Sequence, residues 1–117
     1  MQEAPCLPLS DESITRAADL LRGGGLVAFP TETVYGLGGD ACNAVAVASI
    51  FAAKGRPAFN PLISHVASAS EAFALGIETP AARRLADAFW PGPMTLILQR
   101  APNCPIASLT SAGLDRI

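Results

Sequence analysis

The stretch LVAFPTETVYGLGGDACNAVAVASIFAAK, residues 26–54, predicts a strand, a long polar loop and a helix in succession. Residues 26–29 are a short apolar run closed by Pro30, which is typical of a buried strand. Asn43 begins an alanine-rich helix over residues 44–53, whose packing residues are Val47, Ile50 and Phe51. Strands that alternate with helices are the pattern of α/β proteins.

The chain on either side continues this alternation. A helix capped by Ser10 and stopped by three consecutive glycines comes first, with an apolar stripe of Ile14, Ala17, Ala18 and Leu21. Further along we predict strands over residues 62–66 and 94–98, a short helix over 69–75, and a helix from Thr79–Pro80 to Trp90. The buried stripe of that last helix is predicted to be Ala82, Leu85, Ala86 and Phe89. The whole pattern predicts an α/β fold in which helices cover a sheet.

The composition limits the classes of protein to which this chain can belong. It has 117 residues, of which 50% are hydrophobic and 15% charged, so it suits one globular domain or part of one. The net charge of −2 provides no global positive field to attract nucleic acid. The three cysteines lie far apart without zinc-ligand spacing, which favours reduced thiols. With no signal peptide and no apolar run long enough to span a bilayer, we expect a soluble cytoplasmic protein.

The loop at residues 30–42 is either a wide turn or a ligand site. Its glycines match G-x-G-x-x-A between a strand and a helix. The dinucleotide fingerprint also needs an acidic residue about 20 positions further on, and residues 55–65 contain none. The loop's hydroxyl and carboxylate groups could satisfy its own backbone or bind a ligand at the edge of the sheet, and they belong to Thr31, Glu32, Thr33 and Tyr35.

The segment AKGRPAFNPL, residues 53–62, is the better candidate for binding an anion. Lys54 and Arg56 flank a glycine at the end of a helix, and two prolines stiffen the chain that follows. A guanidinium and an ammonium that converge from a rigid loop can hold phosphate oxygens, although the same cations could simply complement the helix dipole. His65, the one histidine, lies in the apolar segment LISHV and is either packed there or reaches into a cleft.

Three blocks of the sequence, taken in order and spacing, resemble one known family. They are GGGLVAFPTETVYGLGGDA (residues 23–41), IFAAKGRPAFNPLISHV (50–66) and FWPGPMTLIL (89–98). With them the chain resembles the YrdC/Sua5 family of threonylcarbamoyl-AMP synthases from about Ser10 onward. The resemblance implies an open, strongly twisted α/β sheet with helices packed on it and a concave substrate groove. It also implies synthesis of L-threonylcarbamoyladenylate from L-threonine, bicarbonate or CO2 and ATP, with release of pyrophosphate, as the first step of N6-threonylcarbamoyladenosine modification of tRNA.

The resemblance also implies roles for particular residues. Those that resemble contacts to L-threonine are Thr31, Thr33, Tyr35 and His65. Those that resemble contacts to ATP are Lys54 and Arg56, which would hold the phosphates, and Asn60. The segment WPGPMT, residues 90–95, resembles the wall of the pocket. ATP would enter with Mg²⁺, without a metal ligand from the protein or a prosthetic group, and separate proteins would transfer the threonylcarbamoyl group to tRNA.

Departures from the family leave alternatives open. Family members continue past the equivalent of Ile117 into an arginine–proline pair and a Ser-x-Asn motif. We therefore expect residues 1–117 to be the N-terminal part of one YrdC-like domain, weak or inactive alone. A second interpretation is a non-catalytic module that binds double-stranded RNA or tRNA, against which stand the net charge and the lack of interleaved aromatic residues. A third is the related domain of hydrogenase maturation, which normally accompanies zinc-finger-like cysteines that are absent here.

Overall fold

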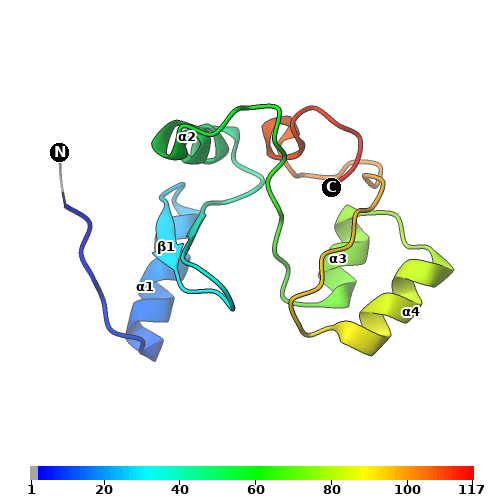
Figure 1. Ribbon diagram of the computed structural model, residues 1–117, viewed down its shortest axis with the longest axis horizontal. Coiled ribbons are helices and arrows are strands. Elements are labelled where there is room, and N and C mark those ends of the chain that lie inside the picture. Colours follow the sequence, from blue (N-terminus) through cyan, green and yellow to red (C-terminus); the bar gives the residue numbers. More distant parts are fainter. Residues whose placement is uncertain (1–2) are drawn as a thin grey trace.

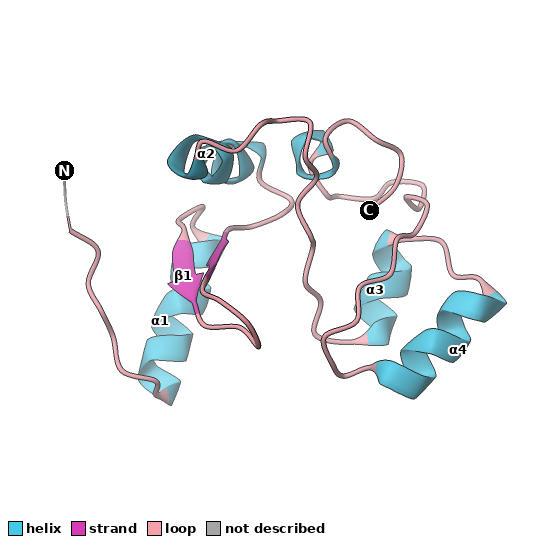
Figure 2. Ribbon diagram, in the orientation of Figure 1, coloured by secondary structure: helices cyan, strands magenta, loops and turns pink. Residues whose placement is uncertain are grey.

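The computed structural model describes residues 3–117, which form two lobes joined by extended segments (Figure 1, Figure 2). The first lobe contains α1 (Asp11–Arg22), β1 (Val27–Phe29), β2 (Gly36–Gly38) and α2 (Ala44–Lys54). The second contains α3 (Ala69–Leu75) and α4 (Pro80–Phe89). A short 3-10 helix, η1 (Ser108–Ser111), packs against α2. None of the helices in this described range is long and apolar enough to cross a membrane.

Each α-helix begins where the sequence predicts, because each has a capping side chain. The caps accept hydrogen bonds from backbone N–H groups of the first turn, and they are Ser10, Asn43, Ser68 and Thr79 for α1 to α4. α2 is followed by Gly55, whose φ of 62° lies in the left-handed region that favours glycine. The helices predicted from the sequence are therefore confirmed to within a residue or two at their ends.

Part of the polar loop pairs back onto the strand that precedes it. β1 and β2 form a two-stranded antiparallel sheet with Val27 opposite Gly38 and Phe29 opposite Gly36. A Cβ at Gly38 would lie 2.6 Å from Cε1 of Phe29, so this close pairing depends on glycine. The predicted first strand is confirmed, while the glycines predicted as loop turn out to form its partner.

α2 supplies the core of the first lobe. Its buried residues are Ala46, Val47, Ile50 and Phe51, which confirms the predicted packing residues. Side chains of Leu26 and Ile50 close over Gly39, where an added Cβ would lie 3.0 Å from Leu26 Cδ2 and 3.1 Å from Ile50 Cδ1. α1 contacts β1 but has no buried residue. The position of α2 is thus the most firmly packed feature of this lobe.

The second lobe is packed with smaller residues. The buried residues of its two helices are Ala72, Ala82 and Ala86. Leu98 lies against Gly76, where an added Cβ would be 2.6 Å from the Leu98 Cβ. Leu85 and Phe89, predicted to be on the buried face of α4, are 43% and 60% exposed, so that prediction was wrong for these two. Periodicity indicates which face of a helix is apolar, but not how much of that face a neighbouring element covers.

The strands predicted at residues 62–66 and 94–98 were also wrong. Neither segment forms part of a sheet within residues 3–117. The Leu62 N–H donates to the Thr110 carbonyl at 2.8 Å, and Leu98 and Ile117 exchange two backbone hydrogen bonds of 2.8 Å each. An apolar run favours extended backbone, but a strand also needs a neighbour in register, which the local pattern does not specify. Both segments nevertheless line a cavity of about 1170 Å³.

Candidate functional site

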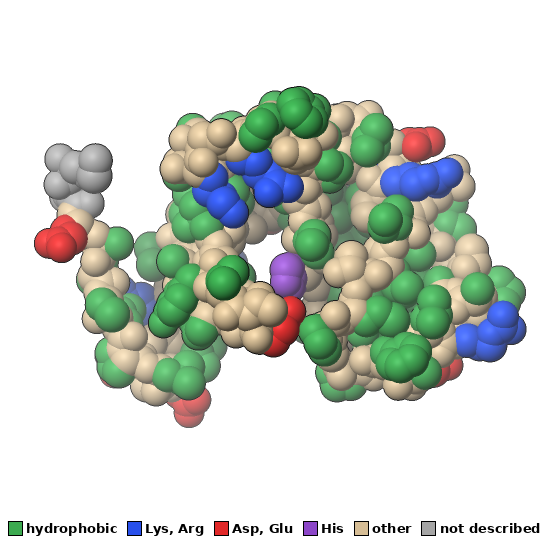
Figure 3. Space-filling view, in the orientation of Figure 1, with side chains coloured by type: hydrophobic (Ala, Val, Ile, Leu, Met, Phe, Trp, Pro, Cys, Tyr) green, Lys and Arg blue, Asp and Glu red, His purple; other side chains and the backbone are tan. Residues whose placement is uncertain are grey.

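A cavity of about 1170 Å³ lies between the second lobe and the extended segments. Most of its lining comes from residues 61–69, 90–98 and 110–117, and Glu32 reaches it from the first lobe. Figure 3 shows this face of the molecule hollowed between the lobes, with Lys and Arg side chains gathered beside α2. Because the lining comes from segments far apart in the sequence, only the folded chain creates this site.

His65 and the WPGPMT segment line the cavity together. His65 is exposed on its extended segment, and its Nδ1 lies 3.2 Å from the Ile63 carbonyl oxygen. The indole N–H of Trp90 donates to the Met94 carbonyl at 2.7 Å, and the Trp90–Pro91 peptide bond is cis. The WPGPMT turn is therefore held by a hydrogen bond from its own indole to its own backbone.

The loop between β1 and β2 uses its hydroxyl groups on itself. The Thr31 hydroxyl donates to the Val34 carbonyl at 2.5 Å and accepts from the Thr33 N–H at 3.2 Å. Tyr35 is 76% exposed. Thr31, Thr33 and Tyr35 are not among the residues that line the cavity, whereas Glu32 is. The loop thus presents its carboxylate to the cavity while its threonines define the turn.

The end of α2 carries two cations, Lys54 and Arg56, that have no acidic partner in the described part of the chain. Lys54 is exposed, and Arg56 donates from Nε to the Asn60 carbonyl at 3.3 Å and from Nη2 to the Pro61 carbonyl at 2.8 Å. Among residues 3–117, neither cation forms a salt bridge. Carbonyl groups orient a guanidinium without neutralising it, so both charges remain available to an anion. Lys54, Arg56 and Asn60 lie outside the lining of the large cavity.

Two cavity residues were missed by the sequence reasoning. Thr110 and Ser111 are the buried polar residues of the described chain, at 3% and 2% exposure, and both line the cavity. The Thr110 hydroxyl donates to the Ala41 carbonyl at 2.8 Å, and Ser111 Oγ lies 3.2 Å from the Leu114 carbonyl oxygen. Nothing in the local pattern ASLTSAGL distinguishes them from an ordinary surface turn, because their burial depends on segments distant in sequence.

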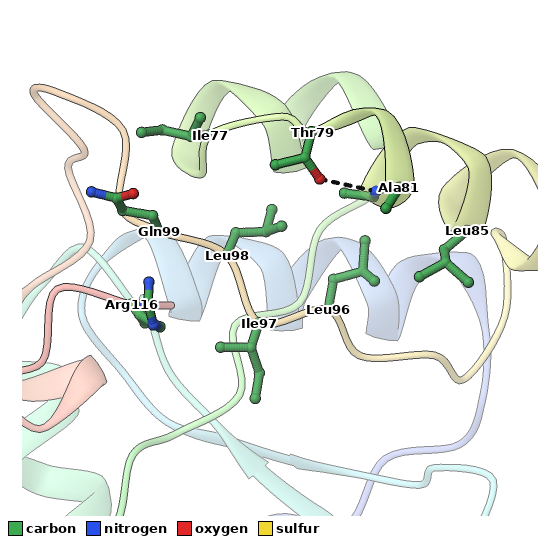
Figure 4. A pocket seen from close by; sticks show the side chains of 10 residues that line it. Ile77, Thr79, Ala81, Leu85, Leu96, Ile97, Leu98, Gln99 and Arg116 are labelled. Carbon is green, nitrogen blue, oxygen red and sulfur yellow. Dashed lines mark hydrogen bonds between the residues drawn. The ribbon is translucent and has the colours of Figure 1, made fainter.

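A smaller groove of about 390 Å³ lies between the start of α4 and residues 96–99 (Figure 4). Leu96 and Leu98 point toward α4 and Ile97 points away, as expected for extended backbone. The Thr79 hydroxyl is already used to cap α4, since it accepts from the Ala82 N–H at 3.1 Å. The groove is therefore mainly an apolar packing surface with little polar chemistry to orient a ligand.

The three cysteine thiols lie outside the lining of the cavity. All three cysteines are free. Burial, together with the nearby Asp40 carboxylate and the Cys104 thiol, raises the pKa of Cys42. No group of three or more His, Cys, Asp or Glu residues in the described part of the chain could hold a metal ion.

Taken together, the fold and the site define an α/β protein with a concave cleft and a pair of free cations beside it. A family model described as telomere recombination, Sua5/YciO/YrdC, matches residues 19–117. The chain therefore belongs to the Sua5/YciO/YrdC family, which confirms both the resemblance and the fold class drawn from the sequence.

Several relatives and solved structures are similar to this chain. Threonylcarbamoyl-AMP synthases of Pyrococcus abyssi and Bacillus subtilis are 49% and 47% identical to it, over 93% and 95% of its length. Pyrococcus abyssi Sua5 complexed with L-threonine superimposes with a TM-score of 0.85 at 47% identity, over 95% of this chain and 32% of that one. MTH1692 of Methanobacterium thermoautotrophicum, at 29% identity, gives 0.72 over 100% of this chain and 55% of its own. The chain spans about a third (32%) of the length of the Pyrococcus and Bacillus synthases.

Proposed function

We propose that this chain contributes to a threonylcarbamoyl-AMP synthase. The reaction would combine L-threonine, bicarbonate or CO2 and ATP into L-threonylcarbamoyladenylate and pyrophosphate. The observation that carries the proposal is the cleft that His65 and the WPGPMT wall form, next to two unpaired cations, in a chain whose relatives bear that enzyme's name. Downstream, separate proteins would use the adenylate to modify tRNA in the cytoplasm.

The amino-acid substrate would bind on the side of the cleft that faces the β1–β2 loop. Pyrococcus abyssi Sua5 was solved with L-threonine, and the match to it covers 95% of this chain and 32% of that one. Thr31, Thr33, Tyr35 and His65 are the proposed contacts. Because the Thr31 hydroxyl already bonds within the loop and lies 3.4 Å from the Thr33 hydroxyl, ligand binding would exchange some of these contacts for bonds to L-threonine.

ATP, as its Mg²⁺ complex, would bind on the side that faces the end of α2. Threonine carbamate and the triphosphate are both anionic, so in-line attack at the α-phosphorus needs positive charge over the phosphates and the departing pyrophosphate. Lys54 and Arg56 would supply that charge, with Asn60 as a further contact. Catalysis would rest on positioning and electrostatics rather than on a covalent enzyme intermediate.

The chain's length relative to its relatives affects what it can do alone. Since it spans about a third of the Pyrococcus and Bacillus synthases, we propose that residues 1–117 form the N-terminal part of a single YrdC-like domain. We expect weak or no turnover by these residues alone, while binding of the separate ligands can still be measured.

Calorimetric titration of ATP and of L-threonine into the chain tests the proposal. Lys54→Met should weaken ATP binding about tenfold, the effect of losing one charged contact of about 1.4 kcal/mol, and leave L-threonine binding unchanged. Arg84→Met is the matched control, since Arg84 is an exposed cation on α4 away from the cleft. Equal effects of the two variants on ATP would contradict the assignment. Salt-sensitive binding of duplex RNA without binding of ATP would favour an RNA-binding module instead.

A further inference from the structure

The turn at η1 joins the two sides of the proposed site. The Ala41 carbonyl, close to the start of α2, accepts from the Ala107 N–H at 2.9 Å and from the Thr110 hydroxyl at 2.8 Å. The Thr110 carbonyl accepts from the Leu62 N–H at 2.8 Å. We call these hydrogen bonds among Ala41, Ala107, Thr110 and Leu62 the joint. On one side of the joint the chain continues from Ala41 into α2 with its cations. On the other side it continues from Leu62 into the extended segment that carries His65.

Arg100 holds this turn from the direction of the second lobe. Its Nη1 donates to Ser111 Oγ at 3.2 Å, and its Nη2 donates to the carbonyl groups of Cys104 at 3.3 Å and Ile106 at 2.5 Å. Its backbone N–H donates to the Asp115 carbonyl at 2.8 Å. The guanidinium thus connects both ends of the segment that contains η1.

The surroundings of Arg100 indicate a fixed role rather than a direct contact with ligand. The residue is half-buried, forms no salt bridge with a described acidic group, and does not line the cavity. Ser111, which Arg100 contacts, is 2% exposed and does line it. A guanidinium holds several N–H donors in one rigid plane and therefore fixes the direction of its acceptors. The single ammonium group of a lysine cannot fix them in the same way.

We infer that Arg100 is a positioning residue of the proposed site. It holds the η1 turn, and through the turn it sets the segment of His65 relative to the end of α2 with Lys54 and Arg56. The inference rests on the proposed function for its ligands, but its structural part can be tested without them. A small displacement of the L-threonine side of the site relative to the ATP side weakens their combined action on the two substrates. It weakens the affinity of either side for its own ligand much less.

Residue-resolved amide exchange by NMR on the whole chain tests the structural part. Arg100→Met should raise exchange of the Leu62 and Ala107 amides about tenfold or more, because both donate across the joint. The amide of Trp90, which bonds within α4, should change less than about twofold. Arg100→Lys should fall between wild type and Arg100→Met. Unchanged exchange at Leu62 and Ala107, or an equal rise at all three amides, would overturn the inference.

A second variant keeps the test open if Arg100→Met does not fold. Ser111→Ala removes one acceptor of Arg100 and should raise exchange at the same two amides. Its effect should be less than additive with that of Arg100→Lys, since the hydrogen bond between Arg100 and Ser111 is disturbed in both variants. Additive effects of the two substitutions would show that Arg100 acts elsewhere.

Ligand titration then separates positioning from general destabilisation. In Arg100→Lys, the separate affinities for ATP and L-threonine should stay within about threefold of wild type, while any enhancement of one ligand by the other should be lost. Loss of both separate affinities with normal exchange at the joint would overturn the inference. If the wild-type chain binds neither ligand, the proposed function fails for this chain, and the amide exchange still decides the role of Arg100.

Discussion

The two lobes of this molecule are packed with side chains of different size. The first lobe buries Val47, Ile50 and Phe51 of one apolar helix. The second buries alanines of α3 and α4 and brings Leu98 into direct contact with Gly76. One lobe is therefore held by large groups that fill space, and the other by small groups that allow close approach.

This difference predicts that the stability of the two lobes responds in opposite ways to smaller and larger side chains. Removing carbon atoms should damage the first lobe, because a cavity is left where a large side chain was. Adding carbon atoms should damage the second, because no space exists for them. The following substitutions test the contrast, from the largest expected effect to the smallest.

Ile50→Ala in the first lobe should lower the free energy of unfolding by about 3 kcal/mol. Ile50 is 4% exposed and closes over Gly39. The same kind of truncation in the second lobe, Leu85→Ala, should cost less than about 1 kcal/mol, because Leu85 is 43% exposed. Urea unfolding monitored by circular dichroism measures both. Similar losses for the two variants would mean that the lobes do not differ in this way.

Gly76→Ala in the second lobe should lower the free energy of unfolding by about 2 kcal/mol. The new methyl group would lie 2.6 Å from the Leu98 Cβ, which is tied to its backbone and cannot move aside alone. Gly39→Ala in the first lobe is the control. There the nearest atoms are the ends of flexible side chains at 3.0 and 3.1 Å, so the expected loss is about 1 kcal/mol or less. A larger loss for Gly39→Ala would reverse the contrast.

The helix caps extend the comparison to hydrogen bonds. Asn43→Ala removes two bonds, to the N–H groups of Val45 at 3.0 Å and Ala46 at 3.1 Å, and should cost about 1.5 kcal/mol. Thr79→Ala removes one, to the Ala82 N–H at 3.1 Å, and should cost about 1 kcal/mol. Differential scanning calorimetry of both variants measures how far each lowers the Tm. Equal decreases in Tm would show that the second hydrogen bond of Asn43 adds nothing to the stability.

The smallest effect is expected at an exposed ion pair of the second lobe. Hydrogen bonding to Arg83 at 2.8 Å lowers the pKa of the Glu78 carboxyl. The ion pair between Glu78 and Arg83 therefore stabilises the folded chain above the ordinary carboxyl pKa of 4.5. This stabilisation is lost as the pH falls through the lowered pKa of the folded state. Glu78→Gln should lower the Tm slightly at pH 7, and the difference from wild type should vanish in acid and shrink in high salt. A difference that grows on acidification would contradict this sign.

Helices were predictable from the sequence because their signals are local. Asn43 and Gly55 mark the two ends of α2 with a side-chain cap and a left-handed backbone, and neither depends on a distant residue. The strands were less predictable. Residues 62–66 have the right apolar pattern, yet within residues 3–117 only the Leu62 N–H finds a distant backbone partner, at Thr110.

The candidate site was predictable in part. His65 and the WPGPMT segment line one cavity, and Lys54 and Arg56 form no salt bridge within residues 3–117, while the roles of these residues toward ligands stay predictions. The roles of Thr31, Thr33, Tyr35 and Asn60 remain predictions, to be tested by ligand binding. The joint around Thr110, Ser111 and Arg100 was not predictable, because its hydrogen bonds link segments up to 69 residues apart.

By itself, the sequence determined the positions of the helices, the apolar segments and the family. These follow from caps, glycines and periodicity, which act over a few residues. The tertiary structure alone decided which extended segments pair, which face of α4 is covered and how the two halves of the cleft are joined. Those features depend on which distant backbone groups meet, and a local pattern cannot specify the meeting of two segments that it does not contain.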